Sequence, residues 1–386
     1  MTDTALRPEQ ATLSNWREAP FNQWAFQHAD AIMPVAPIAP GAGKPLPLPP
    51  GVPALADLVL QTSQGPISLS DALVATATDA VVVLKDGAVV FEHYAHGMTA
   101  EAPHILMSST KAVIGLLADI LGARNLLDLE TEVARYVPEV ADTAYAGATV
   151  RNLLDMRTGV MLDETESIHY AGAGGWDPPA PDDPPGLHAF LAGLKAAHRP
   201  HGGPFSYISP NTDLLGWVME RATGMSVADL LGTHLWRPMG AEHSAFITLA
   251  PDGAPRCTGG LSATARDFAR LGQLIVDDGV RDGVEAIPSA VIEDIAAGGD
   301  PEAWAKGEWG QAFSFISPRM RYRSGWYMVD DSPQVMFAMG IHGQNLFVDR
   351  ANRIVIAKFS SQAQRIDYRA LPLTHLMEKQ IRLTLA

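Results

Sequence analysis

The order of elements along the sequence predicts an α/β fold: an antiparallel sheet flanked by helices, plus an inserted, all-helical lobe. Strand patterns come first, helical patterns fill the middle of the chain, and strand patterns return before a last helix. This order predicts an α/β lobe at about 54–125 and 245–386, and a helical lobe at about 126–244. Hydrophobic residues make up 47% of the 386 residues, which is enough to bury a large core.

The first strands form a predicted hairpin. The apolar runs Ala80–Leu84 and Ala88–Tyr94 are separated by Lys85, Asp86 and Gly87, and Asp-Gly favours a tight turn between strands. The C-terminal third returns to strand patterns and then ends in a helix near 370–383. The strands predicted there are Tyr322–Val329, Val335–Gly340, Asn345–Val348 and Arg353–Phe359.

Helical periodicity begins at residues 108–122, where Val113, Leu116, Leu117 and Ile120 fall on one side. The other segments with clear helical patterns are Thr149–Met156, Gly186–Ala197, Asn211–Ala222, Ser226–Leu235 and Ala263–Asp277. Antiparallel strands beside such a helical insertion predict a cleft between two lobes, and clefts of this kind hold small-molecule sites.

Residues 1–53 differ in composition from the rest of the chain. Four aromatic residues occur within a short polar stretch, which predicts an extension that packs on the body of the protein: Trp16, Phe21, Trp24 and Phe26. The stretch 34–53 is rich in proline and glycine and predicts an extended linker along the surface. We therefore expect one large body at 54–386 and a packed extension before it.

Charge and cysteine content exclude several classes of protein. The formal net charge of −15 makes binding to nucleic acid or to an anionic membrane surface unfavourable. Cys257 is the single cysteine, so neither an internal disulfide nor a cysteine zinc site is expected. The sequence shows no secretory signal and no apolar run long enough to span a bilayer. We expect a cytoplasmic protein that uses no metal and no cofactor.

Ser108 and Lys111 lie three residues apart at the start of the predicted helix 108–122. This spacing places both side chains on one helix face, where a lysine can serve as the base that a serine nucleophile needs. The positive end of the helix would also favour a developing oxyanion. On spacing alone, a capped helix with a solvated lysine is the more common arrangement. The apolar neighbours Ile105–Met107 favour a buried lysine with a lowered pKa instead.

Tyr207 lies in a loop just before the predicted helix 211–222. A tyrosine can act as a second base if a nearby cation such as Lys111 stabilises its phenolate. The alternative is a half-buried tyrosine in a capped loop.

Together these segments resemble the penicillin-recognising serine hydrolases, which include class C β-lactamases, D,D-peptidases and family VIII carboxylesterases. The resemblance implies a β-lactamase/transpeptidase-like fold. It is more specific for the 6-aminohexanoate-dimer hydrolases, also called nylon-oligomer hydrolases, and runs from about Leu13 to the C-terminal helix. The segments that carry it are Asn15–Phe26, Leu106–Ser108, Asn211–Asp213 and Gly340–Asn345.

The resemblance implies a role for each matching residue. Ser108 would be the acylated nucleophile, Lys111 would take its proton, and Tyr207 would relay a proton to the leaving amine or alcohol. The backbone N–H groups of Ser108 and Ile341 would form the oxyanion hole. The implied substrate-binding residues are Trp176, Glu166, Tyr170, Asn211, His342 and Gly343.

The sequence also departs from these relatives. His342 stands in a third motif without Lys-Thr-Gly, which lowers the expectation of β-lactamase activity. The loop from Asp163 to Trp176 looks shorter than in the nylon-oligomer hydrolases. Glu166 falls at the position of their substrate-contacting tyrosine, with Tyr170 as the alternative, and their acid that holds the substrate amino group has no clear counterpart.

We therefore expect hydrolysis of a small-molecule amide or ester through an acyl-enzyme, as in a 6-aminohexanoate-dimer hydrolase, by a chain that forms a homodimer. A family VIII-type carboxylesterase is the alternative, followed by a D-amino-acid peptidase or a β-lactamase. Outside the enzymes, a catalytically silent penicillin-binding-like scaffold stays open.

Overall fold

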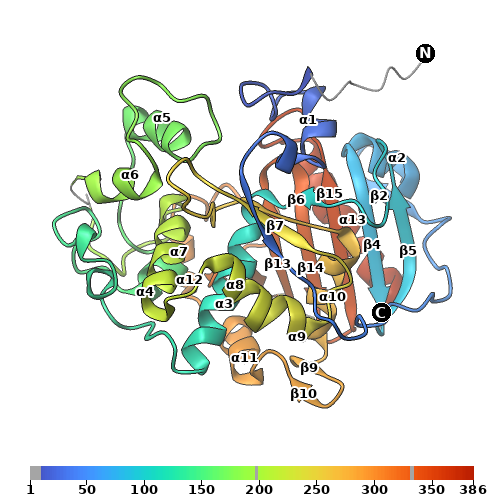
Figure 1. Cartoon of the computed structure of the whole chain (residues 1–386). Coiled ribbons are helices and arrows are strands. Elements are labelled where there is room, and N and C mark those ends of the chain that lie inside the picture. Colours follow the sequence, from blue (N-terminus) through green and yellow to red (C-terminus); the bar gives the residue numbers. More distant parts are fainter. Residues whose placement is uncertain (1–9, 196–198, 331–333) are drawn as a thin grey trace.

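A seven-stranded antiparallel sheet forms the centre of the computed structural model, which describes residues 10–195, 199–330 and 334–386 (Figure 1). The N-terminal hairpin joins the C-terminal strands through pairing of β15 with β4. In spatial order the strands are β11 (Met320–Arg323), β12 (Trp326–Val329), β13 (Val335–Gly340), β14 (Gln344–Asp349), β15 (Ile354–Ser360), β4 (Thr78–Lys85) and β5 (Ala88–Tyr94).

Two tight turns define the strands at the ends of this sheet. Asp86 and Gly87 have φ of 51° and 78°, the left-handed conformation that an Asp-Gly hairpin turn requires, so the first predicted hairpin is confirmed. Ser324 and Gly325 also have positive φ, at 51° and 86°. The single strand predicted at 322–329 is therefore wrong, because the chain reverses there to form β11 and β12.

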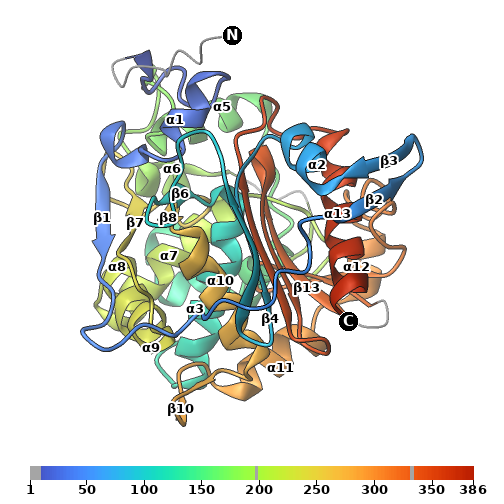
Figure 2. The same ribbon diagram turned by 90° about the vertical axis from the view of Figure 1, so that its right-hand side faces the viewer.

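Helices cover both faces of the sheet (Figure 2). Helices α3 (Thr110–Ala123) and α10 (Ala265–Val276) lie on one face, and α2 (Leu69–Ala75) and α13 (Ala370–Leu385) lie on the other. Residues 110–121 of α3 are all buried, since the helix lies between the sheet and the helical part of the molecule. A Cβ atom at Gly115 would fall 1.9 Å from the carbonyl oxygen of Ser324, so α3 rests directly on the turn after β11.

The helical part is built from short helices around α7 (Pro210–Thr223), which matches its prediction closely. The predicted helix 186–197 corresponds to α6 (Leu187–Gly193), and its residues 196 and 197 lie outside the described part of the chain. The other helices are α4 (Val150–Leu154), α8 (Val227–Leu231) with its π-helical continuation Gly232–Trp236, α9 (Arg237–Met239), α11 (Ser289–Ala297) and α12 (Pro301–Ala305).

Helix α5 (Glu164–Ala173) was not expected, because its polar sequence has no apolar periodicity. A capping box starts the helix: the Asp163 side chain accepts from the Glu166 N–H, and the Glu166 side chain accepts from the Asp163 N–H. The segment from Asp163 to Trp176, expected as a loop, is therefore mostly helix.

A second, four-stranded sheet was also missed, because its strands are only two to four residues long. Its spatial order is β1 (Val35–Ile38), β7 (Ala245–Thr248), β8 (Leu261–Ala263) and β6 (His104–Ile105). Strand β1 comes from the proline-rich stretch, so part of that stretch is a paired strand and not a surface linker. Two small hairpins complete the strands: β2 (Val59–Thr62) with β3 (Gly65–Ser68), and β9 (Val280–Arg281) with β10 (Val284–Glu285).

The N-terminal extension packs against the second sheet. It contains α1 (Phe21–Ala25), and the Trp16 and Phe26 side chains are buried in one apolar cluster with Met107 and Trp176. Within the part of the chain that the structure describes, no helix is both long and apolar enough to cross a membrane.

Candidate active site

Ser108 lies in a 3-10 turn, Met107–Ser109, that leads into α3. The residue before it, Met107, has φ of 46°, an uncommon conformation for a residue other than glycine. Neighbouring contacts hold this turn, since the Leu106 N–H donates to the Leu261 carbonyl at 2.8 Å. Backbone strain at such a position occurs where the surrounding packing fixes a reactive side chain.

Lys111 is buried one turn further along α3, with 2% of its surface exposed. Its Nζ lies 3.1 Å from Ser108 Oγ and donates to the Thr258 carbonyl at 2.7 Å. Burial lowers the pKa of Lys111 to about 7, an effect that the negative charge of Asp213 opposes and the positive charge of Arg256 reinforces. A substantial fraction of Lys111 is therefore neutral at neutral pH and able to accept a proton.

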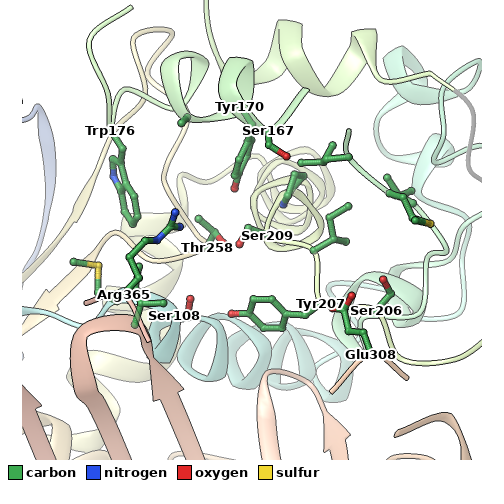
Figure 3. A pocket seen from close by; sticks show the side chains of 18 of the residues that line it. Ser108, Ser167, Tyr170, Trp176, Ser206, Tyr207, Ser209, Thr258, Glu308 and Arg365 are labelled. Atoms are coloured by element: carbon green, nitrogen blue, oxygen red, sulfur yellow. The ribbon is translucent and has the colours of Figure 1, made fainter. Parts of the chain in front are cut away.

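Tyr207 faces Ser108 from the segment before α7. Figure 3 shows the two hydroxyl groups directed toward each other. The Tyr207 ring stacks on Trp309 at 4.3 Å between centroids and lies 4.9 Å from Lys111 Nζ, while its backbone N–H donates to Glu308 Oε1 at 2.7 Å. Burial raises the pKa of Tyr207, which favours the neutral phenol in the free protein.

Asp213, on the first turn of α7, connects Lys111 to the opposite wall of the site. This buried carboxylate accepts hydrogen bonds from Tyr170 Oη at 2.5 Å, Arg256 Nη1 at 2.7 Å and the Thr258 N–H at 2.9 Å. Because the Thr258 carbonyl holds Lys111, Asp213 fixes the lysine through a single residue. Arg256 and Thr258 were not among the residues expected at the site, since their loop has no periodic pattern.

The end of β13 touches the turn that carries Ser108. A Cβ atom at Gly340 would fall 2.7 Å from the Leu106 carbonyl oxygen and 3.0 Å from the Ser108 nitrogen, so only glycine fits there. Ile341 follows directly and lies at the same cavity as Ser108. This contact brings the Ser108 and Ile341 backbones to one wall, as an oxyanion hole requires.

Two cavities meet at Ser108. The larger, of about 680 Å³, extends toward α5, and the smaller, of about 300 Å³, lies beside β13. Residues that line both are Ser108, Tyr207, Ser209, Ile341 and Arg365. Tyr170 and Trp176 line the larger cavity (Figure 3). Apolar side chains line much of the smaller one, including Trp309, Phe313, Tyr327, Met339 and Leu371.

Trp176 is held in the wall of the larger cavity by the N-terminal extension. Its carbonyl accepts from Trp16 Nε1 at 2.9 Å, and its own Nε1 donates to Thr248 Oγ1 at 3.2 Å. The Arg256 guanidinium lies 5.0 Å from the Trp176 ring and 4.7 Å from the Tyr170 ring. Both aromatic side chains therefore contact the cation that pairs with Asp213.

Trp176, Tyr170 and Gly343, three of the six residues expected to bind substrate, line a cavity. Glu166 does not, because its carboxylate caps α5, and this expectation is corrected. Tyr170, one turn later, faces the cavity instead.

Asn211 and His342 are likewise corrected. Asn211 is fully buried, and its side-chain oxygen accepts hydrogen bonds from Tyr145 at 3.2 Å and Thr158 at 3.1 Å. His342 is turned away from both cavities, bonds through Nδ1 to the Gln362 carbonyl, and has its pKa lowered to about 4 by burial. Both residues support the fold around the site.

Residues 68–379 match the Beta-lactamase family model, so the chain belongs to the beta-lactamase family and is a serine hydrolase. Within that family it is 33% identical to a 6-aminohexanoate-dimer hydrolase from Paenarthrobacter ureafaciens over 358 residues, 91% of this chain and 88% of the relative. These findings confirm the predicted family and fold.

Solved structures of other proteins show the same fold. A Bacillus anthracis protein provisionally named as a 6-aminohexanoate-dimer hydrolase superimposes with a TM-score of 0.89 at 26% identity, covering 98% of both chains. A family VIII carboxylesterase shares the fold, with a TM-score of 0.59 at 17% identity over 80% of this chain and 96% of the other.

Proposed function

We propose that this protein hydrolyses a small linear amide or ester through an acyl-enzyme on Ser108, in the manner of a 6-aminohexanoate-dimer hydrolase. The observation that carries the proposal is the position of Ser108 between a buried lysine and a neutral tyrosine, at the junction of two cavities. The relative that is 33% identical over 91% of the chain supports the same substrate class.

In the first step, neutral Lys111 accepts the Ser108 proton and the Ser108 oxygen attacks the substrate carbonyl. The charge that develops on the carbonyl oxygen is stabilised by the backbone N–H groups of Ser108 and Ile341. The Tyr207 phenol then donates its proton to the departing amine or alkoxide and recovers one from protonated Lys111. A water molecule then attacks the acyl-enzyme. The same groups act in reverse: they accept the proton of the water and return a proton to the Ser108 oxygen as it leaves.

Ester hydrolysis is the second candidate function, and the smaller cavity favours it. That cavity presents mainly apolar side chains next to Ser108 and can seat an alkyl or aryl group of limited size. An ester also needs less assistance at its leaving group than an amide.

A cytoplasmic location and a homodimer stay predictions.

A fluorophosphonate probe tests the nucleophile directly. The native protein should be labelled at Ser108, as located by peptide mass spectrometry, and Ser108→Ala should lose both labelling and hydrolysis of short esters and linear amides. Ser109→Ala is the matched control, since the Ser109 hydroxyl donates to the Gln344 carbonyl and lines neither cavity. Labelling at another residue, or unchanged hydrolysis by Ser108→Ala, would contradict the proposal.

A further inference from the structure

Tyr207 lies just before α7 in a segment that belongs to no helix or strand, so its position depends on individual contacts. Backbone N–H groups in such a segment need partners from elsewhere in the chain. The Phe205 N–H donates to the Ala303 carbonyl at 2.9 Å. The Ser206 N–H donates to the Met156 carbonyl, also at 2.9 Å. Two backbone hydrogen bonds therefore fix the chain directly before Tyr207.

Tyr207 itself is held by a side chain instead of a backbone carbonyl. Its N–H donates to Glu308 Oε1 at 2.7 Å, a short distance that is typical of a carboxylate acceptor. The next residue, Trp309, stacks on the Tyr207 ring with 4.3 Å between centroids and 23° between the ring planes. Two consecutive residues thus hold the backbone and the ring of one tyrosine.

The segment that carries Glu308 is itself anchored. The Asp300 side chain caps the first turn of α12, and the Gly307 N–H donates to the Trp304 carbonyl at 2.9 Å after the helix ends. A Cβ atom at Gly307 would fall 2.5 Å from the Phe205 carbonyl oxygen, so only glycine allows this close contact. The segment therefore rests directly on the chain that leads to Tyr207.

The two ends of Tyr207 have different surroundings. Figure 3 shows Glu308 near its backbone and Ser108 at its hydroxyl. Because the ring is rigid, a shift of the backbone moves the hydroxyl relative to Ser108. A displacement of about 1 Å in an active site can lower a rate by about 100-fold. The hydrogen bond to Glu308 is therefore in a position to control proton delivery at the other end of the side chain.

We propose that Glu308 is a positioning residue for Tyr207, whose carboxylate holds the tyrosine backbone so that the phenol can deliver its proton to the leaving group. The inference rests on the proposed function, since it concerns proton transfer at the same Ser108 site. Glu308 acts through Tyr207 and has no contact with the reacting atoms. Its removal should therefore matter most for substrates whose leaving group needs a proton.

Two esters with one acyl group test the proposal with the full-length protein. Ethoxide must be protonated as it leaves ethyl hexanoate, whereas p-nitrophenolate leaves p-nitrophenyl hexanoate without a proton. In Glu308→Ala, kcat/KM for ethyl hexanoate should fall by about 10- to 100-fold, because the phenol is displaced. The value for p-nitrophenyl hexanoate should change less than about threefold. Glu308→Gln keeps an oxygen that can accept the Tyr207 N–H and should recover most of the activity.

Glu285→Ala is the matched control. Glu285 Oε1 also accepts a backbone N–H, from Ser289 at 3.0 Å, and the residue lines neither cavity. Its removal costs the same kind of hydrogen bond and the same charge, at the start of α11. Both esters should be hydrolysed as fast as by the native protein.

A double variant shows whether Glu308 acts through the phenol. In the Tyr207→Phe background, adding Glu308→Ala should lower kcat/KM for ethyl hexanoate by less than about twofold, because residues that act as one unit are not additive. Losses that multiply would overturn the proposal, as would no loss in Glu308→Ala. Glu308 also lines the larger cavity, so equal losses on the two esters would assign it to substrate binding instead.

A spectroscopic measurement separates this inference from the proposed function. Fluorine NMR of protein labelled with fluorotyrosine reports on the Tyr207 ring, whose resonance is identified by its loss in Tyr207→Phe. This resonance should shift or broaden in Glu308→Ala and keep its native position in Glu308→Gln and Glu285→Ala. An unchanged resonance in Glu308→Ala, or the same change in Glu308→Gln, would refute the positioning role even if hydrolysis were observed. If no Ser108-dependent hydrolysis occurred, the proposed function would fail, while the resonance would still decide whether Glu308 positions Tyr207.

Discussion

The two walls of the site are built in different ways. The wall with Ser108 and Lys111 is the start of α3, a long helix buried on all sides and pressed against the central sheet. The facing wall is built from α5, the loop that carries Arg256 and Thr258, and the N-terminal extension behind Trp176. The first wall places the reacting groups on a rigid element, and the second assembles substrate contacts from segments far apart in sequence. Substitutions in the first should therefore affect chemistry, and substitutions in the second should affect substrate choice and the setting of the base.

The largest effect is expected from Lys111→Met, which keeps the volume of the side chain and removes the proposed base. We expect kcat/KM to fall on the order of a thousandfold or more on both esters and amides. Lys85→Met is the control, since Lys85 lies at the end of β4 and bonds to the Asn352 carbonyl. Steady-state kinetics on a p-nitrophenyl ester decide the outcome, and a loss of tenfold or less would rule out the role assigned to Lys111.

Tyr207→Phe should have the next largest effect, and it should depend on the leaving group. The ring can still stack on Trp309, so the variant removes mainly the phenolic proton donor. Amide hydrolysis should fall by about 100- to 10,000-fold, the range for general acid catalysis. A p-nitrophenyl ester, whose leaving group needs no proton, should lose much less. Equal losses on the amide and the activated ester would mean that the hydroxyl positions Ser108 and does not deliver a proton.

The pH profile tests whether the second wall sets the protonation of the first. Because the base must be neutral, kcat/KM should rise with pH through about 7, the pKa of Lys111. Asp213 raises that pKa and Arg256 lowers it. Asp213→Asn should therefore move the rising limb to lower pH, and Arg256→Gln should move it to higher pH.

Both variants break the same buried ion pair, so a purely structural effect should be similar in the two. Shifts of the pH profile in opposite directions would therefore indicate an electrostatic effect on Lys111. Thermal unfolding measured alongside should show lower stability for both variants. If the rising limbs of both variants moved in the same direction, or did not move, Asp213 and Arg256 would not set the pKa of Lys111. Asp213 would then be a structural residue.

The smallest effect is expected from Glu166→Ala. The structure assigns this side chain to the capping of α5, so KM for short esters should change less than about twofold. The melting temperature should fall slightly, since a lost cap interaction costs about 1 kcal/mol at most sites. A large rise in KM with unchanged stability would restore Glu166 as a substrate contact.

The difference between the two walls of the site also explains which elements could be predicted from the sequence. Strands β4, β5 and β13–β15 and helices α3, α7 and α10 were expected because each is long enough for its apolar pattern to be read. Ser108, Lys111 and Tyr207 begin or precede such helices, so a short spacing or a capped loop locates them. Helix α5 and the second sheet could not be predicted from the sequence. Helix α5 depends on its caps, and the strands of the second sheet are too short to show a periodic pattern.

Substrate-facing residues were harder for a related reason. Glu166 and Tyr170 differ by one helical turn, and only the direction of α5 decides which of them meets the cavity. Asn211 and His342 are polar residues in matching segments, yet both use their polarity to satisfy buried backbone and side-chain groups.

The hydrogen bond from Trp16 to the Trp176 carbonyl has a practical consequence for protein engineering. The N-terminal extension, which the sequence predicts to pack on the body, supports a cavity wall 160 residues further along the chain. Trimmed or fused versions of the N-terminus that disturb Trp16 would therefore act as substrate-range variants, and libraries aimed at new amide or ester substrates gain a second place to vary, outside the cavity itself.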